Sequence, residues 1–247
     1  GKVQIVDYAK LPGISGQNHN RTLLLGLIFG LGAGIALAFA LEFLDNTIKS
    51  VDDVARHNLV VLGVIPSIGD PEKRKRKLFF NKNPFLPASG SRGLRRRLMT
   101  REDPKSPVSE AYRSLRTSLL YSSSEKEPKS ILISSAGPGE GKTTTVANLA
   151  ITYANLGKKT LLVDTDLRRP VVHKVFELNR EPGVTTYLSS TTDDYNSLIQ
   201  DCEIDNLKII TAGIIPPNPS ELLGSERMTN LVKQLENDWD IVLFDSP

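Results

Sequence analysis

A glycine-rich loop with one lysine is the segment of this 247-residue chain whose residue types and spacing most clearly serve chemistry. It reads GPGEGKTT over residues 137–144, between an apolar run and a stretch with helical apolar spacing. Gly139 and Gly141 let the backbone curl so that its amides face an anion, and a helix N-terminus adds positive potential. Lys142 would then reach the β and γ phosphates of a nucleotide, and the Thr143 hydroxyl would ligate Mg²⁺.

The loop departs at one position from the usual phosphate-loop pattern, GxxxxGK[ST], because Ala136 stands where the first glycine is expected. The flanking strand and helix are the context that this pattern requires, so we interpret the segment as a phosphate-binding loop. The predicted nucleotide-binding residues are Gly137, Pro138, Gly139, Glu140, Gly141, Lys142, Thr143, Thr144 and Arg168. For Arg168 the sequence leaves two roles open, support of the phosphates or a structural ion pair.

Acidic residues follow two further apolar runs. In LLVDTDLRRP, residues 161–170, extended geometry would point Asp164 and Asp166 to the same face. Such carboxylates suit a hard cation or a proton acceptor. In DIVLFDSP, residues 240–247, Asp245 fits the acid that holds Mg²⁺, often through water. We predict Lys142, Asp164 and Asp166 as catalytic residues, and Thr143, Asp164 and Asp245 as metal ligands. Whether Asp164 or Asp166 is the base or a ligand stays open.

Parallel strands are the elements that would bring these three motifs together, since ligands bind at the carboxyl ends of such strands. We expect strands near residues 131–134, 160–164, 207–211 and 241–245, and a helix from Lys142 to near Gly157. The run at 131–133 is expected to be buried and the run at 161–163 to be central. The predicted fold is an α/β, doubly wound, mainly parallel P-loop sheet.

One uncharged stretch is long enough to cross a membrane. Residues 22–41 are rich in Leu, Ile, Ala, Phe and Gly and lie between Arg21 and Glu42. Twenty helical residues span roughly 30 Å, one hydrocarbon core. A buried core helix or a signal peptide is the alternative, but each would normally be shorter. Residues 51–65 then combine an amphipathic stretch with an apolar, strand-like one.

The charge and composition of the chain exclude several kinds of protein and indicate the orientation of the span. With 31 basic and 28 acidic side chains the net charge is +3, which excludes a global polycation. One cysteine and three histidines exclude a disulfide framework and a cysteine/histidine zinc site. Basic runs at 73–77 (KRKRK) and 95–97 (RRR) place the C-terminal side of the span in the cytoplasm. No aromatic platform accompanies them, so we expect no nucleic acid partner.

The combination of PGEGKTT, LLVDTDLRRP and VLFDSP resembles the bacterial protein-tyrosine kinases that regulate the export of extracellular and capsular polysaccharide. The span and residues 44–68 after it look like the second membrane helix and exit segment of the attached polysaccharide co-polymerase, or chain-length determinant. In EAYRSLRTSL, Glu110, Arg113 and Arg116 match the family's ExxRxxR self-association helix, and PPNPSELL, residues 216–223, also matches. This spacing puts the three charges on one helical face, which could equally be a solvated face with internal ion pairs.

The resemblance implies a membrane-anchored autokinase that uses ATP and Mg²⁺ to phosphorylate tyrosines in a C-terminal cluster of a neighbouring subunit. Its implied partners are further copies in a ring-like homo-oligomer, the bacterial inner (cytoplasmic) membrane, the polysaccharide export and polymerase machinery, and a cognate tyrosine phosphatase. None of the six tyrosines present is assigned as an acceptor. Two alternatives remain, an ATP hydrolase that acts as a dimerisation switch and a non-catalytic export scaffold.

Related chromosome-partitioning and septum-placing ATPases carry an additional lysine early in the phosphate loop, where this chain has Gly137. This departure favours the kinase interpretation.

The resemblance and the span together divide the chain into four parts. They are the end of an external (periplasmic) co-polymerase region (1–21), a transmembrane helix (22–43), a cytoplasmic exit segment with a basic linker (44–101) and a P-loop kinase domain (102–247). Because the chain lacks an initiator methionine and stops just after a strand, we expect an interior fragment with an incomplete sheet.

Overall fold

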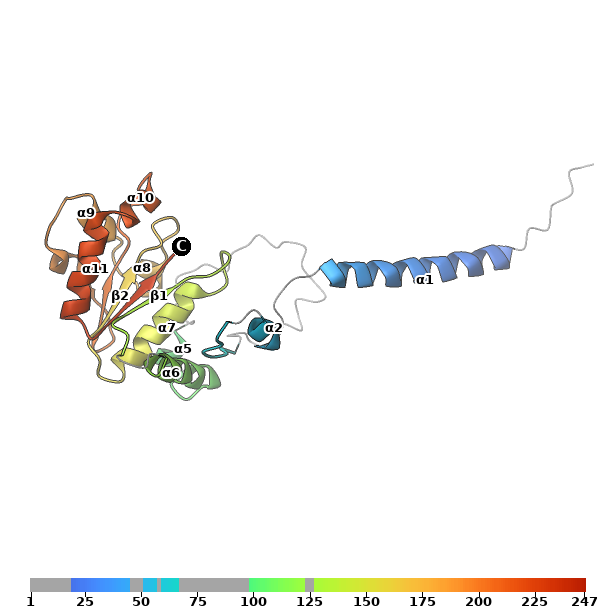
Figure 1. Ribbon diagram of the computed structural model, residues 1–247, viewed down its shortest axis with the longest axis horizontal. Coiled ribbons are helices and arrows are strands. Elements are labelled where there is room, and N and C mark those ends of the chain that lie inside the picture. The colour runs from blue at the N-terminus through green and yellow to red at the C-terminus, as the bar shows by residue number, and fades with distance from the viewer. Residues whose placement is uncertain (1–18, 45–50, 57–58, 67–97, 123–126) are drawn as a thin grey trace, which may run out of the picture. The chain divides into compact units, whose positions relative to one another are not determined.

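The computed structural model of the chain describes residues 19–44, 51–56, 59–66, 98–122 and 127–247. The basic runs at 73–77 and 95–97 lie outside these residues. By its internal contacts the chain divides into two units, Gly1–Val60 and Val61–Pro247. The first unit contains the helices α1 (His19–Leu44) and α2 (Val51–Arg56), and the second contains the sheet with its covering helices (Figure 1).

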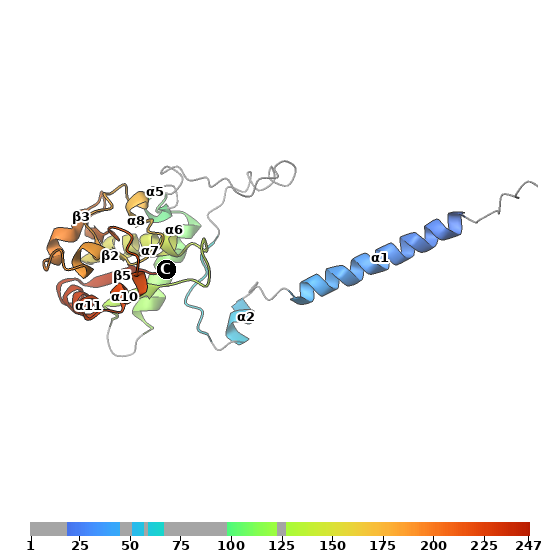
Figure 2. The same ribbon diagram turned by 90° about the horizontal axis from the view of Figure 1, so that it is seen from above.

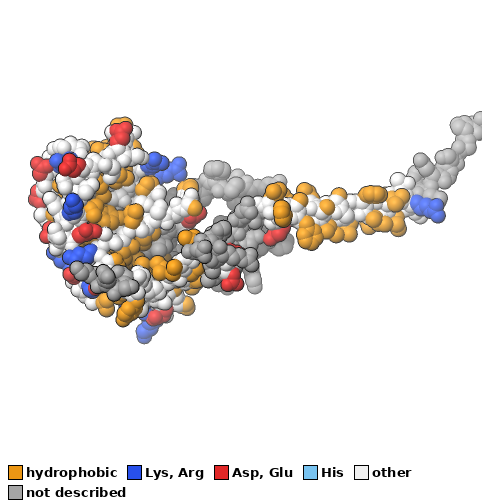
Figure 3. All heavy atoms as spheres, viewed as in Figure 1, with side chains coloured by type: hydrophobic (Ala, Val, Ile, Leu, Met, Phe, Trp, Pro, Cys, Tyr) orange, Lys and Arg blue, Asp and Glu red, His pale blue; other side chains and the backbone are white. Residues whose placement is uncertain are grey.

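Helix α1 is the one helix among the described residues that is long and apolar enough to cross a membrane. Its segment Asn20–Leu44 has a mean hydropathy of 2.4, and none of its most apolar window is buried. Hydrophobic side chains cover it along its length (Figure 3). At about 1.5 Å per residue, the 26 residues of α1 extend roughly 39 Å, so the predicted span fits inside the helix.

The second unit is built on a five-stranded sheet with the order β1-β5-β2-β4-β3. The strands are β1 (Ser130–Ile133), β2 (Thr160–Asp164), β3 (Ile199–Asp201), β4 (Leu207–Ile210) and β5 (Ile241–Asp245). All neighbours pair in parallel except β3, which runs antiparallel to β4 at one edge. The predicted mainly parallel α/β sheet is confirmed, and β2 and β5 have the predicted limits.

Helices lie on both faces of this sheet, as in a doubly wound fold (Figures 1 and 2). The longer ones are α6 (Pro107–Leu120), α7 (Lys142–Ala154) and α11 (Glu226–Asp238). Shorter segments are α5 (Met99–Glu102), α8 (Val172–Val175), α9 (Val184–Leu188), the 3₁₀ turn η1 (Tyr195–Leu198) and α10 (Pro219–Leu223).

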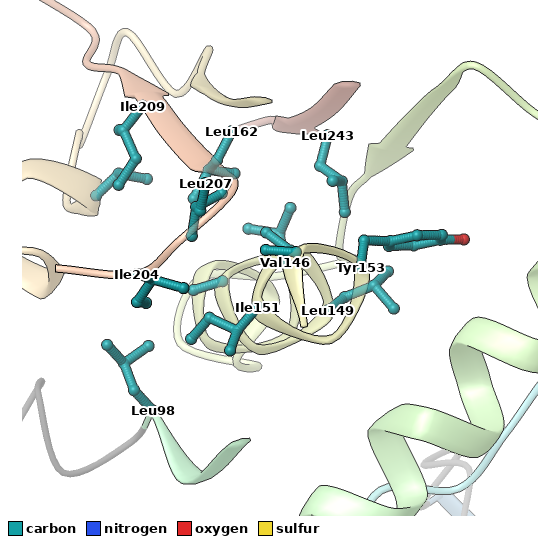
Figure 4. Close-up of a cluster of buried hydrophobic side chains, with 14 of the residues drawn as sticks. Leu98, Val146, Leu149, Ile151, Tyr153, Leu162, Ile204, Leu207, Ile209 and Leu243 are labelled. Atoms are coloured by element: carbon teal, nitrogen blue, oxygen red, sulfur yellow. The ribbon is translucent and has the colours of Figure 1, made fainter. Parts of the chain in front are cut away.

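Two separate cores result from the alternation of side chains along the strands. Leu162 and Leu243 belong to the core on the face covered by α7, where Val146 points toward them (Figure 4). Leu161 and Val163, which flank Leu162 in sequence, belong to the other core, together with side chains of α9 and α11. Burial on both faces explains why β2 and β5 read as uninterrupted apolar runs in the sequence.

Strand β1 departs from the sequence analysis. It was expected to be buried, but it forms an edge of the described sheet, and 67% of the Leu132 surface is exposed. The strand-like run at 59–66, in contrast to β1, forms no strand. It is largely exposed, and an added Cβ at Gly63 would lie 3.5 Å from the side chain of Leu115 on α6. Strand β3, with only three residues, was not expected.

The packed unit also includes residues before the expected domain start at 102. Leu98 is buried in the α7 core. The backbone amide and the hydroxyl of Thr100 donate hydrogen bonds of 3.0 and 2.9 Å to Oδ1 of the buried Asn148 on α7. The segment that enters the domain is therefore fastened to the helix that begins at Lys142.

Candidate functional site

The loop between β1 and α7 has the backbone that an anion cradle requires. Gly139 and Gly141 adopt φ values of +85° and +98°, which side-chain-bearing residues rarely adopt. Gly141 is the N-cap of α7, so no side chain caps the first amides of the helix. These amides, with the positive end of the helix dipole, form a binding site for phosphate oxygens.

Lys142 and Thr143, the first two residues of α7, meet acids from two neighbouring strand ends. The ammonium of Lys142 lies 2.7 Å from Oδ2 of Asp166 and 3.9 Å from Oδ1 of Asp245. The hydroxyl of Thr143 donates to Oδ2 of Asp245 over 2.6 Å. The three sequence motifs therefore converge, because β1, β5 and β2 are adjacent, parallel and in register at their carboxyl ends.

Asp164 is held by different partners from those of Asp166. Its Cα is paired with that of Asp245 across β2 and β5, and its side chain is fully buried. Both of its oxygens accept backbone hydrogen bonds, of 3.2 Å each, from the amides of Asp166 and Val172. Asp164 thus fixes the turn after β2, while Asp166 beyond the strand end pairs with Lys142.

The three carboxyl groups have different affinities for protons. Burial, with a further contribution from Asp245, raises the pKa of Asp164 to about 7. Burial also raises the pKa of Asp245 to about 6, although Thr143 and Lys142 act in the opposite direction. Burial alone would raise the pKa of Asp166, but the hydrogen bond from Lys142 and the backbone amides of the following turn outweigh it and lower that pKa. The site therefore has excess acid that an added cation would hold in its charged form.

The residues present fit Mg²⁺ in this position. Oδ1 of Asp245 is buried and accepts no hydrogen bond among the described residues, so it is an oxygen available to a cation or its water. Thr143 presents a hydroxyl to the same carboxylate. No group of three His, Cys, Asp or Glu in the described part of the chain could enclose a metal ion. That suits Mg²⁺, which keeps several waters and binds one or two carboxylates together with phosphates.

Two cavities flank the loop. One, of about 310 Å³, is lined among others by Pro138, Gly139, Gly141, Lys142, Thr143 and Thr144. The other, of about 430 Å³, is lined by Gly137, Pro138, Lys142, Arg168 and their neighbours. Glu140 borders neither cavity, and its carboxylate folds back toward Gly137, 3.3 Å from the point where an added Cβ would lie. All other predicted nucleotide-binding residues lie at one of the two cavities.

Arg168 forms no ion pair among the described residues. Its guanidinium donates instead to the hydroxyl of Ser220 on α10 over 3.2 Å. This explains the place of the PPNPSELL segment, which forms α10 beside the turn after β2. Arg169, which was not among the predicted residues, lines both cavities. Its position in the run LRRP, three residues after Asp166, is the signal that could have indicated it.

The three charges of the ExxRxxR helix do not share one environment. Glu110 and Arg113 form an exposed ion pair on α6, as in the solvated-face alternative. Arg116 turns toward α7 instead, and its guanidinium donates to the carbonyl of Thr152 over 2.7 Å. Glu110 is therefore exposed and Arg113 partly exposed, whereas Arg116 is held against α7.

Comparisons with known proteins agree with this geometry. Residues 128–247 match the family model described as an AAA domain. The tyrosine-protein kinase YwqD of Bacillus subtilis is 43% identical over 158 residues, which cover 64% of this chain and 66% of that protein. The tyrosine-protein kinase Etk of Escherichia coli K12 is 32% identical over all of this chain and 34% of its own length. The chain thus spans about two thirds of the first relative and one third of the second.

A solved structure extends the likeness to three dimensions. The kinase domain of the Escherichia coli tyrosine kinase ETK is 30% identical, with a TM-score of 0.67. The match covers 81% of this chain and 73% of the solved one. Sequence and fold therefore lead to the same group of proteins.

Proposed function

The chain belongs to the family of bacterial tyrosine-protein kinases, and on that basis we propose that it is a membrane-anchored, ATP-dependent tyrosine autokinase. The observation that carries the proposal is the meeting of Lys142, Thr143, Asp166 and Asp245 at an uncapped helix N-terminus. This is the set of groups that phosphoryl transfer needs, since catalysis of that reaction is mostly positioning and charge neutralisation.

ATP with Mg²⁺ would supply the transferable γ-phosphoryl group and the main counter-charge. We propose that the loop amides and Lys142 hold the phosphate oxygens, and that Thr143 and Asp245 hold the metal ion. When the ammonium of Lys142 turns to the phosphates, Asp166 loses its partner while still facing the cavity. Asp166 is then placed to accept the proton of an incoming tyrosine hydroxyl, and Asp164 holds the turn that carries it.

Membership of this family also suggests the roles of the membrane helix and of the region before it. We propose that α1 crosses the bacterial inner membrane and that the P-loop unit works in the cytoplasm. In this proposal the region before the span belongs to a polysaccharide co-polymerase, and the enzyme regulates export and chain length of an extracellular or capsular polysaccharide. The export machinery and a cognate tyrosine phosphatase would be its partners. The length and apolar character of α1 support the anchoring.

Self-association into a ring-like homo-oligomer is the remaining proposal. The exposed Glu110–Arg113 pair on α6 supports it, because charged groups at the rim of an interface set orientation and specificity. Arg116 would contribute by holding α6 against α7.

The test is to incubate the intact protein, in detergent or native membranes, with γ-labelled ATP and Mg²⁺. A tyrosine-containing polymer serves as added acceptor, so the result does not depend on the protein's own acceptor sites. Phosphoamino-acid analysis should find label on tyrosine, and the Lys142→Met variant should lose it. Release of free phosphate without phosphotyrosine would contradict the kinase and select a nucleotide-controlled switch. An unchanged length of the exported polysaccharide in cells that carry Lys142→Met would indicate a non-catalytic scaffold.

A further inference from the structure

Two adjacent arginines follow Asp166, and the structure uses them differently. The guanidinium of Arg168 donates to Ser220, which ties it to α10. The guanidinium of Arg169 has no hydrogen bond or ion pair among the described residues. Arg169 nevertheless borders both cavities beside the phosphate loop, together with Pro138, Lys142 and Asp166. It is therefore an uncommitted cation at the junction of the two cavities.

The backbone of Arg169 is held in place although its side chain is free. Its amide donates to Oδ1 of Asp166 over 2.9 Å, while Oδ2 of the same carboxylate accepts from Lys142. Pro170 follows directly and is buried, and a residue before proline is restricted to extended conformations. The carboxylate of Asp166 thus holds both the backbone amide of Arg169 and the ammonium of Lys142.

The negative charges of the carboxylates and of a bound nucleotide would exceed the positive charge that Lys142 supplies. Asp166 and Asp245 lie near a single ammonium, that of Lys142, and Asp164 is paired with Asp245 across β2 and β5. Fully ionised ATP carries a charge of about −4, which one Mg²⁺ reduces to about −2, so one lysine does not balance the phosphates and the acids. An arginine can bind phosphate oxygens through two parallel hydrogen bonds, which a lysine cannot do.

We propose that Arg169, and not Arg168, is the arginine that binds the β and γ phosphate oxygens of the nucleotide, while Arg168 anchors the turn to α10. The inference rests on the proposed function, because it takes the cavity beside Lys142 as the nucleotide site. It assigns to Arg169 a role in nucleotide binding that can be measured without any phosphotransfer.

The experiment measures nucleotide affinity by isothermal titration of the intact, detergent-solubilised protein with ATP, ADP and AMP in the presence of Mg²⁺. The variants are Arg169→Ala, Arg169→Lys and the matched control Arg168→Ala. Both arginines are exposed, so their removal leaves the cores intact. Far-ultraviolet circular dichroism and thermal melting verify the fold of each variant.

We expect Arg169→Ala to weaken ATP binding about tenfold or more, as befits a lost charge-assisted hydrogen bond to phosphate. The loss should be smaller for ADP and smallest for AMP, which lacks the β and γ phosphates. Arg169→Lys should recover part of the affinity, and Arg168→Ala should stay within about threefold of the unmodified protein. The inference is overturned if Arg169→Ala binds ATP within about twofold of the unmodified protein, or if Arg168→Ala loses as much affinity.

The tyrosine-phosphorylation assay on the unmodified protein separates this inference from the proposed function. If ATP binding depends on Arg169 but no phosphotyrosine forms, the kinase proposal fails and the role of Arg169 stands. If phosphotyrosine forms while ATP affinity is insensitive to Arg169, the inference fails and the kinase proposal stands.

Discussion

Two ion pairs in the P-loop unit join the same kinds of group in opposite surroundings. The Lys142–Asp166 pair leaves 15% and 9% of its side-chain surfaces exposed, whereas Arg113 and Glu110 leave 39% and 63%. The first pair lies beside acids whose pKa values burial has shifted, and the second lies on a solvated helix face. Burial therefore decides whether an ion pair lies among groups with shifted pKa values or only adds two charges to a solvated surface.

The largest effect is expected from removing the cation of the buried pair. Lys142→Met should lower the initial rate of tyrosine phosphorylation by at least about 100-fold, because it removes the positive charge that binds the transferred phosphoryl group. Lys158→Met is the matched control, since it breaks an exposed pair with Glu127. A Lys142→Met rate within about threefold of the unmodified protein would remove the contrast between the two regions.

The next effect concerns the acids left partly uncompensated in the buried region. Because burial raises the pKa values of Asp164 and Asp245, the folded state binds protons more tightly than the unfolded state. The free energy of unfolding should therefore fall as the pH rises from about 4 to about 7, and change less above that. Denaturant titrations across this range measure the slope.

Asp245→Asn tests how much Asp245 contributes to the pH dependence of the free energy of unfolding. The amide oxygen can still accept the bond from Thr143, so the variant loses a buried charge and the attraction of that charge to Lys142. It should be more stable than the unmodified protein at pH 8, by an amount on the order of 1–3 kcal/mol, and nearly equal to it at pH 4. Asp193→Asn, which removes an exposed carboxylate, should alter neither value. Equal pH slopes for the unmodified protein and Asp245→Asn would contradict this explanation.

A smaller effect is expected where the surface helix meets the core. Arg116 donates to the carbonyl of Thr152 in the last turn of α7, a group that no helical amide can reach. Arg116→Ala should therefore lower the free energy of unfolding by about 1–2 kcal/mol, measured by denaturant titration. Arg116→Lys should recover part of this loss. A loss of oligomer without any loss of stability would instead place Arg116 in an interface.

The smallest effect on stability is expected from the exposed pair. Arg113→Ala should change the free energy of unfolding by less than about 1 kcal/mol, because exposed ion pairs contribute little. If the Glu110–Arg113 pair serves self-association, the same variant should shift the protein to smaller species in analytical ultracentrifugation. An unchanged assembly state would show that this face is only solvated.

The sequence determines much of this fold through its buried strands. The limits of β2 and β5 were predictable because both faces of each strand are covered, which produces uninterrupted apolar runs. The run at 59–66 is also largely apolar but pairs with no strand among the described residues, so its apolar composition alone predicted it wrongly. The burial of Leu132 was overestimated because a short apolar run does not reveal whether its strand is central or at an edge.

Within the site, the sequence predicted which motifs meet but not how their side chains divide the work. Spacing treated Asp164 and Asp166 as equivalent, yet the turn after β2 gives Asp164 two backbone amides and leaves Asp166 to Lys142. In the same way, the two arginines diverge only because Ser220, about fifty residues later, meets one of them. Such choices depend on local backbone turns and distant segments, which periodicity does not encode.

The most direct measurement is a crystal structure of the P-loop unit, within the intact protein, bound to Mg²⁺ and a non-hydrolysable ATP analogue. The account predicts phosphate oxygens on the amides of the glycine loop and on Lys142, with the metal ion bound to Thr143 and joined to Asp245 directly or through water. A nucleotide found elsewhere, with the Lys142–Asp166 pair and the Thr143–Asp245 hydrogen bond intact beside an empty loop, would contradict it.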